Sequence, residues 1–123
     1  MSPRSSIFVI DDDPGMLRSI ARLLKVYRFE VQTFTSAEEF LNSANARDAG
    51  CLVLDIHLGG MSGIDLGHKL ALSGIAIPVI FITANDSDVV RKAAVEVGCR
   101  AYLPKPFSAK ELMNAVEKAL AGP

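Results

Sequence analysis

The sequence SIFVIDDD occupies residues 6–13 and joins an apolar, β-branched run to three carboxylates. A continuous apolar run of this length is typical of a strand that helices cover on both faces, as in a parallel sheet. Four further stretches share this strand-forming character: residues 29–34, 51–54, 78–82 and 100–103. Residues 29–34 alternate apolar and polar side chains, which favours a place nearer the edge of the sheet. Pro104 is expected to end the last strand.

Helical patterns lie between these strands. The first helix has an apolar face formed by Leu17, Ile20, Leu23, Leu24 and Tyr27. Three later helices begin with capping-box spellings: Ser36-x-x-Glu39, Ser62-x-x-Asp65 and Ser108-x-x-Glu111. A further helix is expected to begin around residues 86–88 and to end at Gly98. Because crossovers between parallel strands are right-handed, this (βα)₅ order predicts an α/β fold with a five-stranded parallel sheet between two helical layers.

Length and composition favour one soluble domain over residues 1–123, with its core over about residues 6–121. The formal net charge of −1 offers no general attraction for nucleic acid or an anionic membrane. No apolar run approaches the roughly 18–20 residues that cross a bilayer, and the N-terminus lacks a secretory pattern. We therefore expect a cytoplasmic protein, in which Cys51 and Cys99 are small buried thiols rather than a disulfide.

Polar side chains follow the predicted strands at their carboxyl ends. The first strand is followed by Asp11 and Asp12, the third by Asp55, the fourth by Thr83 and the fifth by Lys105. In open α/β sheets the binding crevice lies at this edge, so these side chains are expected to converge. Asp13, directly before Pro14, is better explained as a helix N-cap.

Carboxylates that share one crevice repel each other, by about 4 kcal/mol for a pair at about 4 Å and an effective dielectric constant near 20. A hard divalent cation relieves this repulsion, and Mg²⁺ favours carboxylate and water oxygens while leaving positions open for phosphate. Thr83 and Lys105 supply a hydroxyl and an ammonium that suit phosphoryl oxygens. The pattern therefore predicts phosphoryl transfer to or from a carboxylate.

These motifs resemble the receiver (response-regulator) domain of bacterial two-component signalling over about residues 6–121. The resemblance rests on five motifs in order: Asp11-Asp12, Asp55, Met61-Ser62-Gly63, Thr83-Ala84 and Lys105-Pro106-Phe107. It implies a flavodoxin-like sheet with the strand order 2-1-3-4-5. It also implies that a sensor histidine kinase or a phosphotransfer protein donates a phosphoryl group to Asp55.

The same resemblance implies a role for each site residue. Asp12 and Asp55 would bind Mg²⁺ through their side chains, His57 through its backbone carbonyl, and Asp11 mainly through a bound water. Lys105 would pair with the phosphoryl oxygens, with a cis peptide bond to Pro106. The domain would catalyse its own phosphorylation and dephosphorylation without being a turnover enzyme.

The resemblance further implies a switch. Thr83 would hydrogen-bond the phosphorylated group, and Tyr102 would rotate inward behind it. This changes the face made by the fourth helix, fifth strand and fifth helix, which would control an output domain or partner, with transcription regulation as the expected output. The residues of that face (Val89, Val90, Lys92, Arg100 and Tyr102) are compatible with a phosphorylation-dependent homodimer. No nucleic-acid binding is expected from the segment itself.

The chain departs from the family pattern after Asp55, where Leu58-Gly59 replaces the usual Met-Pro. This is expected to loosen the backbone beside the His57 carbonyl and to bear on metal affinity. His57 and Asn85, each two residues beyond a site residue, flank the route of a hydrolytic water and are expected to set the lifetime of the aspartyl phosphate.

Other functions fit less well. A phosphatase of the haloacid-dehalogenase type needs a second Asp two residues after its nucleophile, where this chain has His57. A pseudo-receiver that is never phosphorylated is opposed by the complete set of site residues. The glycines of residues 59–63 lack the spacing of a nucleotide-binding loop, His57 and His68 lack transition-metal spacing, and Glu38 and Glu39 are expected to be a cap and a solvated face. The C-terminal Ala121-Gly122-Pro123 fits a stand-alone receiver and the start of a linker equally.

Overall fold

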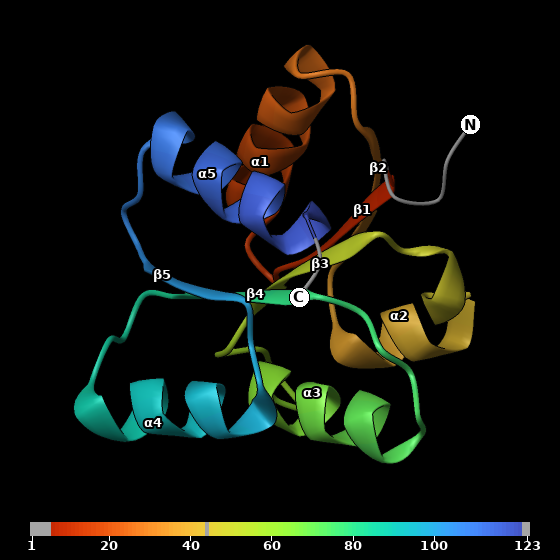
Figure 1. Ribbon diagram of the computed structural model, residues 1–123, viewed down its shortest axis with the longest axis vertical. Coiled ribbons are helices and arrows are strands. Elements are labelled where there is room, and N and C mark those ends of the chain that lie inside the picture. Colours follow the sequence, from red (N-terminus) through yellow and green to blue (C-terminus); the bar gives the residue numbers. More distant parts are fainter. Residues whose placement is uncertain (1–5, 44, 122–123) are drawn as a thin grey trace.

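A five-stranded parallel sheet crosses the middle of the molecule (Figure 1). The computed structural model describes residues 6–43 and 45–121, so the expectations for the extreme termini lie outside the described residues. The strands are β1 (Ser6–Ile10), β2 (Glu30–Phe34), β3 (Cys51–Asp55), β4 (Val79–Thr83) and β5 (Ala101–Pro104). Their spatial order is β2-β1-β3-β4-β5, which confirms the predicted topology and places β2 at an edge.

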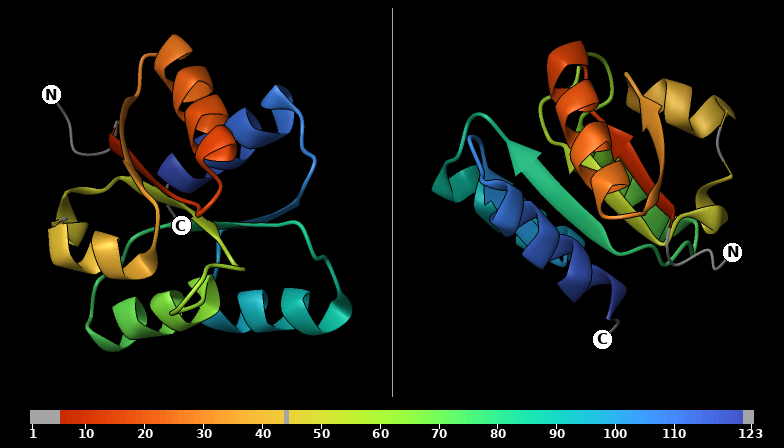
Figure 2. Two further views of the ribbon diagram at one scale, coloured as in Figure 1. Left: turned by 180° about the vertical axis from the view of Figure 1, so that it is seen from behind. Right: turned by 90° about the horizontal axis from the view of Figure 1, so that it is seen from above.

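Helices cover both faces of the sheet. They are α1 (Pro14–Val26), α2 (Ala37–Ser43), α3 (Gly63–Leu72), α4 (Asp88–Val97) and α5 (Ala109–Leu120), with a short 3₁₀ helix, η2 (Ala46–Asp48), before β3. Helices α1 and α5 lie on one face, and α2, α3 and α4 lie on the other (Figure 1). Figure 2 shows the same division from behind, with α1 in orange and α5 in blue above the sheet.

The two layers enclose two separate hydrophobic cores. Alternate side chains of a strand point to opposite faces, so Ile7 and Val9 of β1 pack in the core under α1 and α5. Phe8 and Ile10 enter the core under α2, α3 and α4. Because both faces of the central strands are buried, the uninterrupted apolar runs that predicted them are explained by packing.

Strand and helix limits differ from the sequence prediction by about one residue. Phe29 precedes β2 because its amide bonds the Leu24 carbonyl at the end of α1, where Arg28 has a φ of 70°. Tyr27, predicted on the apolar face of the first helix, is its C-cap and is 52% exposed. At the other ends, β3, β4 and β5 each run one residue further than expected. Pro104 is therefore the last residue of β5 rather than its stop.

The helix caps follow the predicted residues. Asp13 accepts hydrogen bonds from the Gly15 and Met16 amides, and Ser62 caps α3 through the Asp65 amide. Ser108 and Glu111 form a complete capping box at α5. Helix α4 begins at Asp88, with Ser87 as its cap, and ends at Gly98 with a φ of 89°, as its sequence predicts.

Both cysteines are free thiols, Cys51 buried and Cys99 half-buried. None of the helices in the described part of the chain has the length and apolar character that crossing a bilayer requires. The fold thus brings the carboxyl ends of β1, β3, β4 and β5 to one edge of a closely packed sheet.

Gly63 packs closely against the backbone at the end of β3. It begins α3, its amide donates to the Ile56 carbonyl at 2.9 Å, and a Cβ built on it would overlap the carbonyl oxygen of Asp55. Gly63→Ala is therefore expected to lower the free energy of unfolding by about 1–3 kcal/mol, measured by urea denaturation. Gly59→Ala is the matched control, because a Cβ there meets no atom within 4 Å. Equal stability of the two variants would contradict this account.

Candidate functional site

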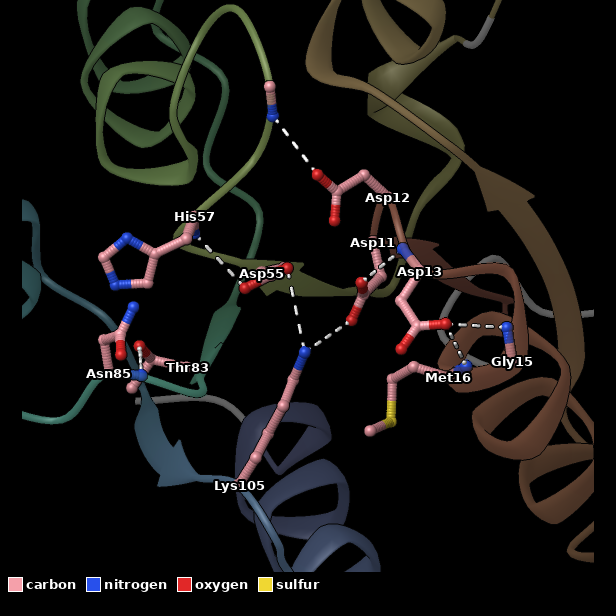
Figure 3. Close-up of polar contacts among 11 residues, drawn as sticks. Asp11, Asp12, Asp13, Gly15, Met16, Asp55, His57, Thr83, Asn85 and Lys105 are labelled. Carbon is pink, nitrogen blue, oxygen red and sulfur yellow. Dashed lines mark hydrogen bonds and ion pairs between the residues drawn. The ribbon is translucent and has the colours of Figure 1, made fainter.

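Side chains from four strand ends meet at one edge of the sheet (Figure 3). Asp11 follows β1, Asp55 ends β3, Thr83 ends β4 and Lys105 follows β5. The Lys105 Nζ lies 2.9 Å from Asp11 Oδ2 and 3.7 Å from Asp55 Oδ2. The predicted convergence of Lys105 with the acidic residues is therefore present.

Three carboxylates form the acidic part of the site. Asp11 is fully buried and Asp55 is 4% exposed, whereas Asp12 is exposed. One ligand oxygen of each lies within 4.8 Å of the others. Asp11 is held in place by the Asp13 amide, which donates to its Oδ1 at 2.9 Å, as well as by Lys105. Three hard oxygen donors so close together fit a Mg²⁺ ion that completes its shell with water.

Burial and charge act against ionisation of Asp55. Desolvation and the neighbouring Asp11 carboxylate raise the pKa of Asp55 from its ordinary value of 3.8 to about 6. Lys105 and the His57 amide, which donates to Asp55 Oδ1 at 3.2 Å, lower that pKa by less. One ammonium therefore only partly offsets the carboxylates, and a divalent cation would favour the anionic, nucleophilic form of Asp55.

Thr83 and Lys105 line the other side of the site. Thr83 is buried, and its Oγ1 accepts a hydrogen bond from the Asn85 amide at 3.0 Å, which leaves the hydroxyl proton to donate elsewhere. The Lys105 amide donates to the Thr83 carbonyl at 2.7 Å, which fixes β5 beside β4. The Lys105-Pro106 peptide bond is cis, as expected.

His57 and Asn85 lie on the same side of the site, next to Asp55 and Thr83 (Figure 3). Both are exposed at the rim. The backbone amide of His57 donates a hydrogen bond to the Asp55 carboxylate. The metal role expected of His57 concerns its backbone carbonyl, which takes no part in this bond.

Tyr102 is held by two residues that the sequence analysis did not single out. Its hydroxyl donates to Asp86 Oδ1 at 2.8 Å, and Arg91 pairs with Asp86 Oδ2 at 2.9 Å. The Arg91 guanidinium also lies 5.2 Å from the centre of the Tyr102 ring. No spacing in the sequence predicts this group, because it forms only once β5 is paired with β4 and the loop before α4 has folded.

Glu38 is exposed, as expected for a solvated face, but it also makes a contact that the sequence did not predict. Its Oε2 accepts a hydrogen bond from the Met61 amide at 2.9 Å, in the loop that follows Asp55. In the same loop the Gly59 amide donates to Asp12 Oδ2 at 3.3 Å. The segment beside His57, which was expected to be loose, is thus held by two carboxylates from other parts of the chain. The bond between Glu38 and Met61 joins residues 23 positions apart, so no local sequence pattern indicates it.

Because the pKa of Asp55 is raised in the folded state, the ionised carboxylate lowers the free energy of unfolding of the metal-free protein. Asp55→Asn is therefore expected to raise the free energy of unfolding in EDTA at about pH 7.5, by about 1–3 kcal/mol. The gain should shrink as the pH falls through about 6 and vanish only below the ordinary pKa of 3.8, because the wild-type carboxyl is then protonated in both the folded and the unfolded state. Urea denaturation at several pH values measures this; a less stable Asn variant at pH 7.5 would refute it.

Comparison with known proteins agrees with this geometry. The chain is 36% identical over 121 residues to the response regulator protein TodT of Pseudomonas putida, covering 98% of this chain and 53% of TodT. It is 35% identical over 117 residues to the transcriptional regulatory protein TdiR of Thauera aromatica, covering 95% and 52%. The chain thus spans about half the length of these curated relatives.

Solved structures show the same fold. The crystal structure of FixJ-N matches with a TM-score of 0.87 and 31% identity, covering 96% of this chain and 94% of that one. A family model described as the response regulator receiver domain matches residues 7–117. Since this model spans most of the chain and the side chains from four strand ends meet in one site (Figure 3), the chain belongs to the response regulator receiver domain family.

Proposed function

We propose that Asp55 accepts a phosphoryl group from a phosphohistidine of a sensor histidine kinase or phosphotransfer protein, in a Mg²⁺-dependent reaction. The observation that supports this most is the position of the Lys105 Nζ, 2.9 Å from Asp11 and 3.7 Å from Asp55. It puts one cation beside the proposed acceptor oxygen, where transferred negative charge has to be neutralised.

The metal would be held by the oxygen-rich side of the site. Asp12 and Asp55 are the proposed side-chain ligands, with the His57 carbonyl as a third and Asp11 acting through a water. Their hard oxygens suit Mg²⁺, which supplies further neutralisation of the phosphoryl oxygens when bound.

The residues of the chain divide the remaining work. A carboxylate oxygen of Asp55 attacks phosphorus in line with the bond to the donor nitrogen, whose electron pair leaves with the imidazole. Lys105 pairs with a phosphoryl oxygen, and the Thr83 hydroxyl donates to another. The His57 amide, already 3.2 Å from Asp55, orients the acceptor carboxylate.

A receiver fits better than a turnover phosphatase. The residue two positions after Asp55 is His57, not the second Asp that haloacid-dehalogenase phosphatases require. We propose that His57 and Asn85, both at the rim, set the rate at which water hydrolyses the aspartyl phosphate. A change in that rate in His57→Ala, measured as loss of the phosphoryl group, is the expected result.

The output is proposed from the relatives. Because TdiR is named a transcriptional regulatory protein and is about twice as long as the matched segment, we propose that this receiver controls transcription through a further domain. The controlling face is α4-β5-α5, where Val89 is 80% exposed and Tyr102 and Arg91 lie nearby. The same face is the proposed surface for a homodimer that forms on phosphorylation.

Incubation with Mg²⁺ and acetyl phosphate tests the acceptor. The protein is expected to gain one acid-labile phosphoryl group, seen by intact mass spectrometry, and Asp55→Asn should gain none. Omitting Mg²⁺ should abolish the gain as well. Rapid release of many equivalents of phosphate would indicate a phosphatase instead, and an unmodified wild-type protein would indicate a pseudo-receiver.

The Asp86 contact predicts how Tyr102 is held without phosphate. The chain has two tyrosines, so 3-fluorotyrosine labelling gives separate ¹⁹F signals for Tyr27 and Tyr102. Asp86→Ala removes the acceptor of the Tyr102 hydroxyl, so its signal should move towards the phosphorylated position without a phosphodonor. Asp88→Ala, a matched exposed change two residues along, should leave it in place. An unmoved Tyr102 signal in Asp86→Ala would contradict the proposal.

A further inference from the structure

We propose that Glu38 is a positioning residue for the metal site: by holding the loop of residues 57–62, it fixes the carboxylate of Asp12. The inference rests on the proposed Mg²⁺-dependent function of that site. It concerns a side chain on α2 that no motif of the sequence connects with Asp55.

The contact between Glu38 and the loop is specific. Glu38 lies in the first turn of α2, and its Oε2 accepts the Met61 amide at 2.9 Å. Gly60, with a φ of 77°, leaves the space for this approach, because a Cβ there would lie 2.9 Å from the same oxygen. The bond is charge-assisted, and it lowers the pKa of Glu38.

Few other bonds hold this loop. At its start the His57 amide bonds Asp55, and at its end Gly63 bonds Ile56. Among the hydrogen bonds of the described residues, the backbone amides of Leu58 to Ser62 make two, Gly59 to Asp12 and Met61 to Glu38. The bond from the Met61 amide to Glu38, at 2.9 Å, is shorter than the bond from the Gly59 amide to Asp12, at 3.3 Å, and is the stronger of the two.

Asp12 depends on the loop in turn. It is exposed, and within the described part of the chain the Gly59 amide is the hydrogen-bond donor to its side chain. Asp11 and Asp55, by contrast, are buried; Lys105 donates a hydrogen bond to Asp11 and forms an ion pair with Asp55. A loop released from Glu38 would move the Gly59 amide and the His57 carbonyl together, so Asp12 would lose its orientation towards the other two carboxylates (Figure 3).

Groups that orient metal ligands from outside commonly change affinity by about 10–100-fold when removed. Because Glu38 is exposed and acts through a backbone amide, we expect the low end of that range. Glu38→Ala should weaken Mg²⁺ binding by about tenfold, and Glu38→Gln, which keeps an acceptor oxygen, should stay within about threefold of wild type. Glu117→Ala on α5 is the control for loss of one exposed carboxylate.

Isothermal titration with Mg²⁺ gives the dissociation constants, and amide hydrogen exchange in EDTA gives a readout that needs no metal. The exchange of the Gly59 and Met61 amides should accelerate in Glu38→Ala and much less in Glu38→Gln. Unchanged Mg²⁺ affinity in Glu38→Ala would overturn the proposal. Equal weakening in both variants would do the same, since it would assign the effect to charge alone.

The proposed function can fail separately. If the wild-type protein binds no Mg²⁺, the proposed metal-binding function of the site is refuted. The exchange measurement then still decides whether Glu38 holds the loop, and unaltered Gly59 exchange in Glu38→Ala would refute that holding role.

Discussion

The repulsion among three carboxylates is the constraint on which the arrangement of this domain depends. Asp11, Asp12 and Asp55 present oxygens within 4.8 Å of one another, and two of them are shielded from water. Such a group is stable only where other parts of the chain supply compensating donors. Lys105 does so from the far end of the sequence, 94 positions after Asp11, and the backbone amides of Asp13 and His57 do so locally.

The strand order makes that compensation geometrically simple. β1 and β3 are neighbours, so their carboxyl ends place Asp11 and Asp55 side by side. β4 and β5 continue the sheet on one side, and the amide of Lys105 is tied to Thr83. The Lys105 ammonium and the Thr83 hydroxyl therefore approach from one direction and Asp12 from the other. The core under α2, α3 and α4 supports these strands from one side, because Phe8, Leu54 and Phe81 are fully buried in it and close-packed interiors resist displacement.

Much of this arrangement could be predicted from the sequence, for a physical reason. The runs ending in Asp11, Asp55 and Thr83 are buried on both faces, so their composition reports their environment directly. Capping residues such as Ser108 report on the adjacent helix turn in the same local way. The contacts of Glu38 and Asp86 were not predictable, because each joins an exposed polar residue to a loop or a strand whose place is fixed only by tertiary packing. Exposed acidic residues look alike in a sequence whether they are solvated or bonded.

The two edge strands of the sheet, β2 and β5, are poorly suited to pairing with a further strand. β2 carries Glu30, Gln32 and Thr33 as exposed side chains, and β5 is four residues long and ends in Pro104, which has no amide proton to offer. Short, polar or proline-terminated margins discourage backbone pairing with another chain. Two copies of this domain can therefore lie against each other without joining their sheets, so that any recognition between them rests on side chains and not on backbone hydrogen bonds.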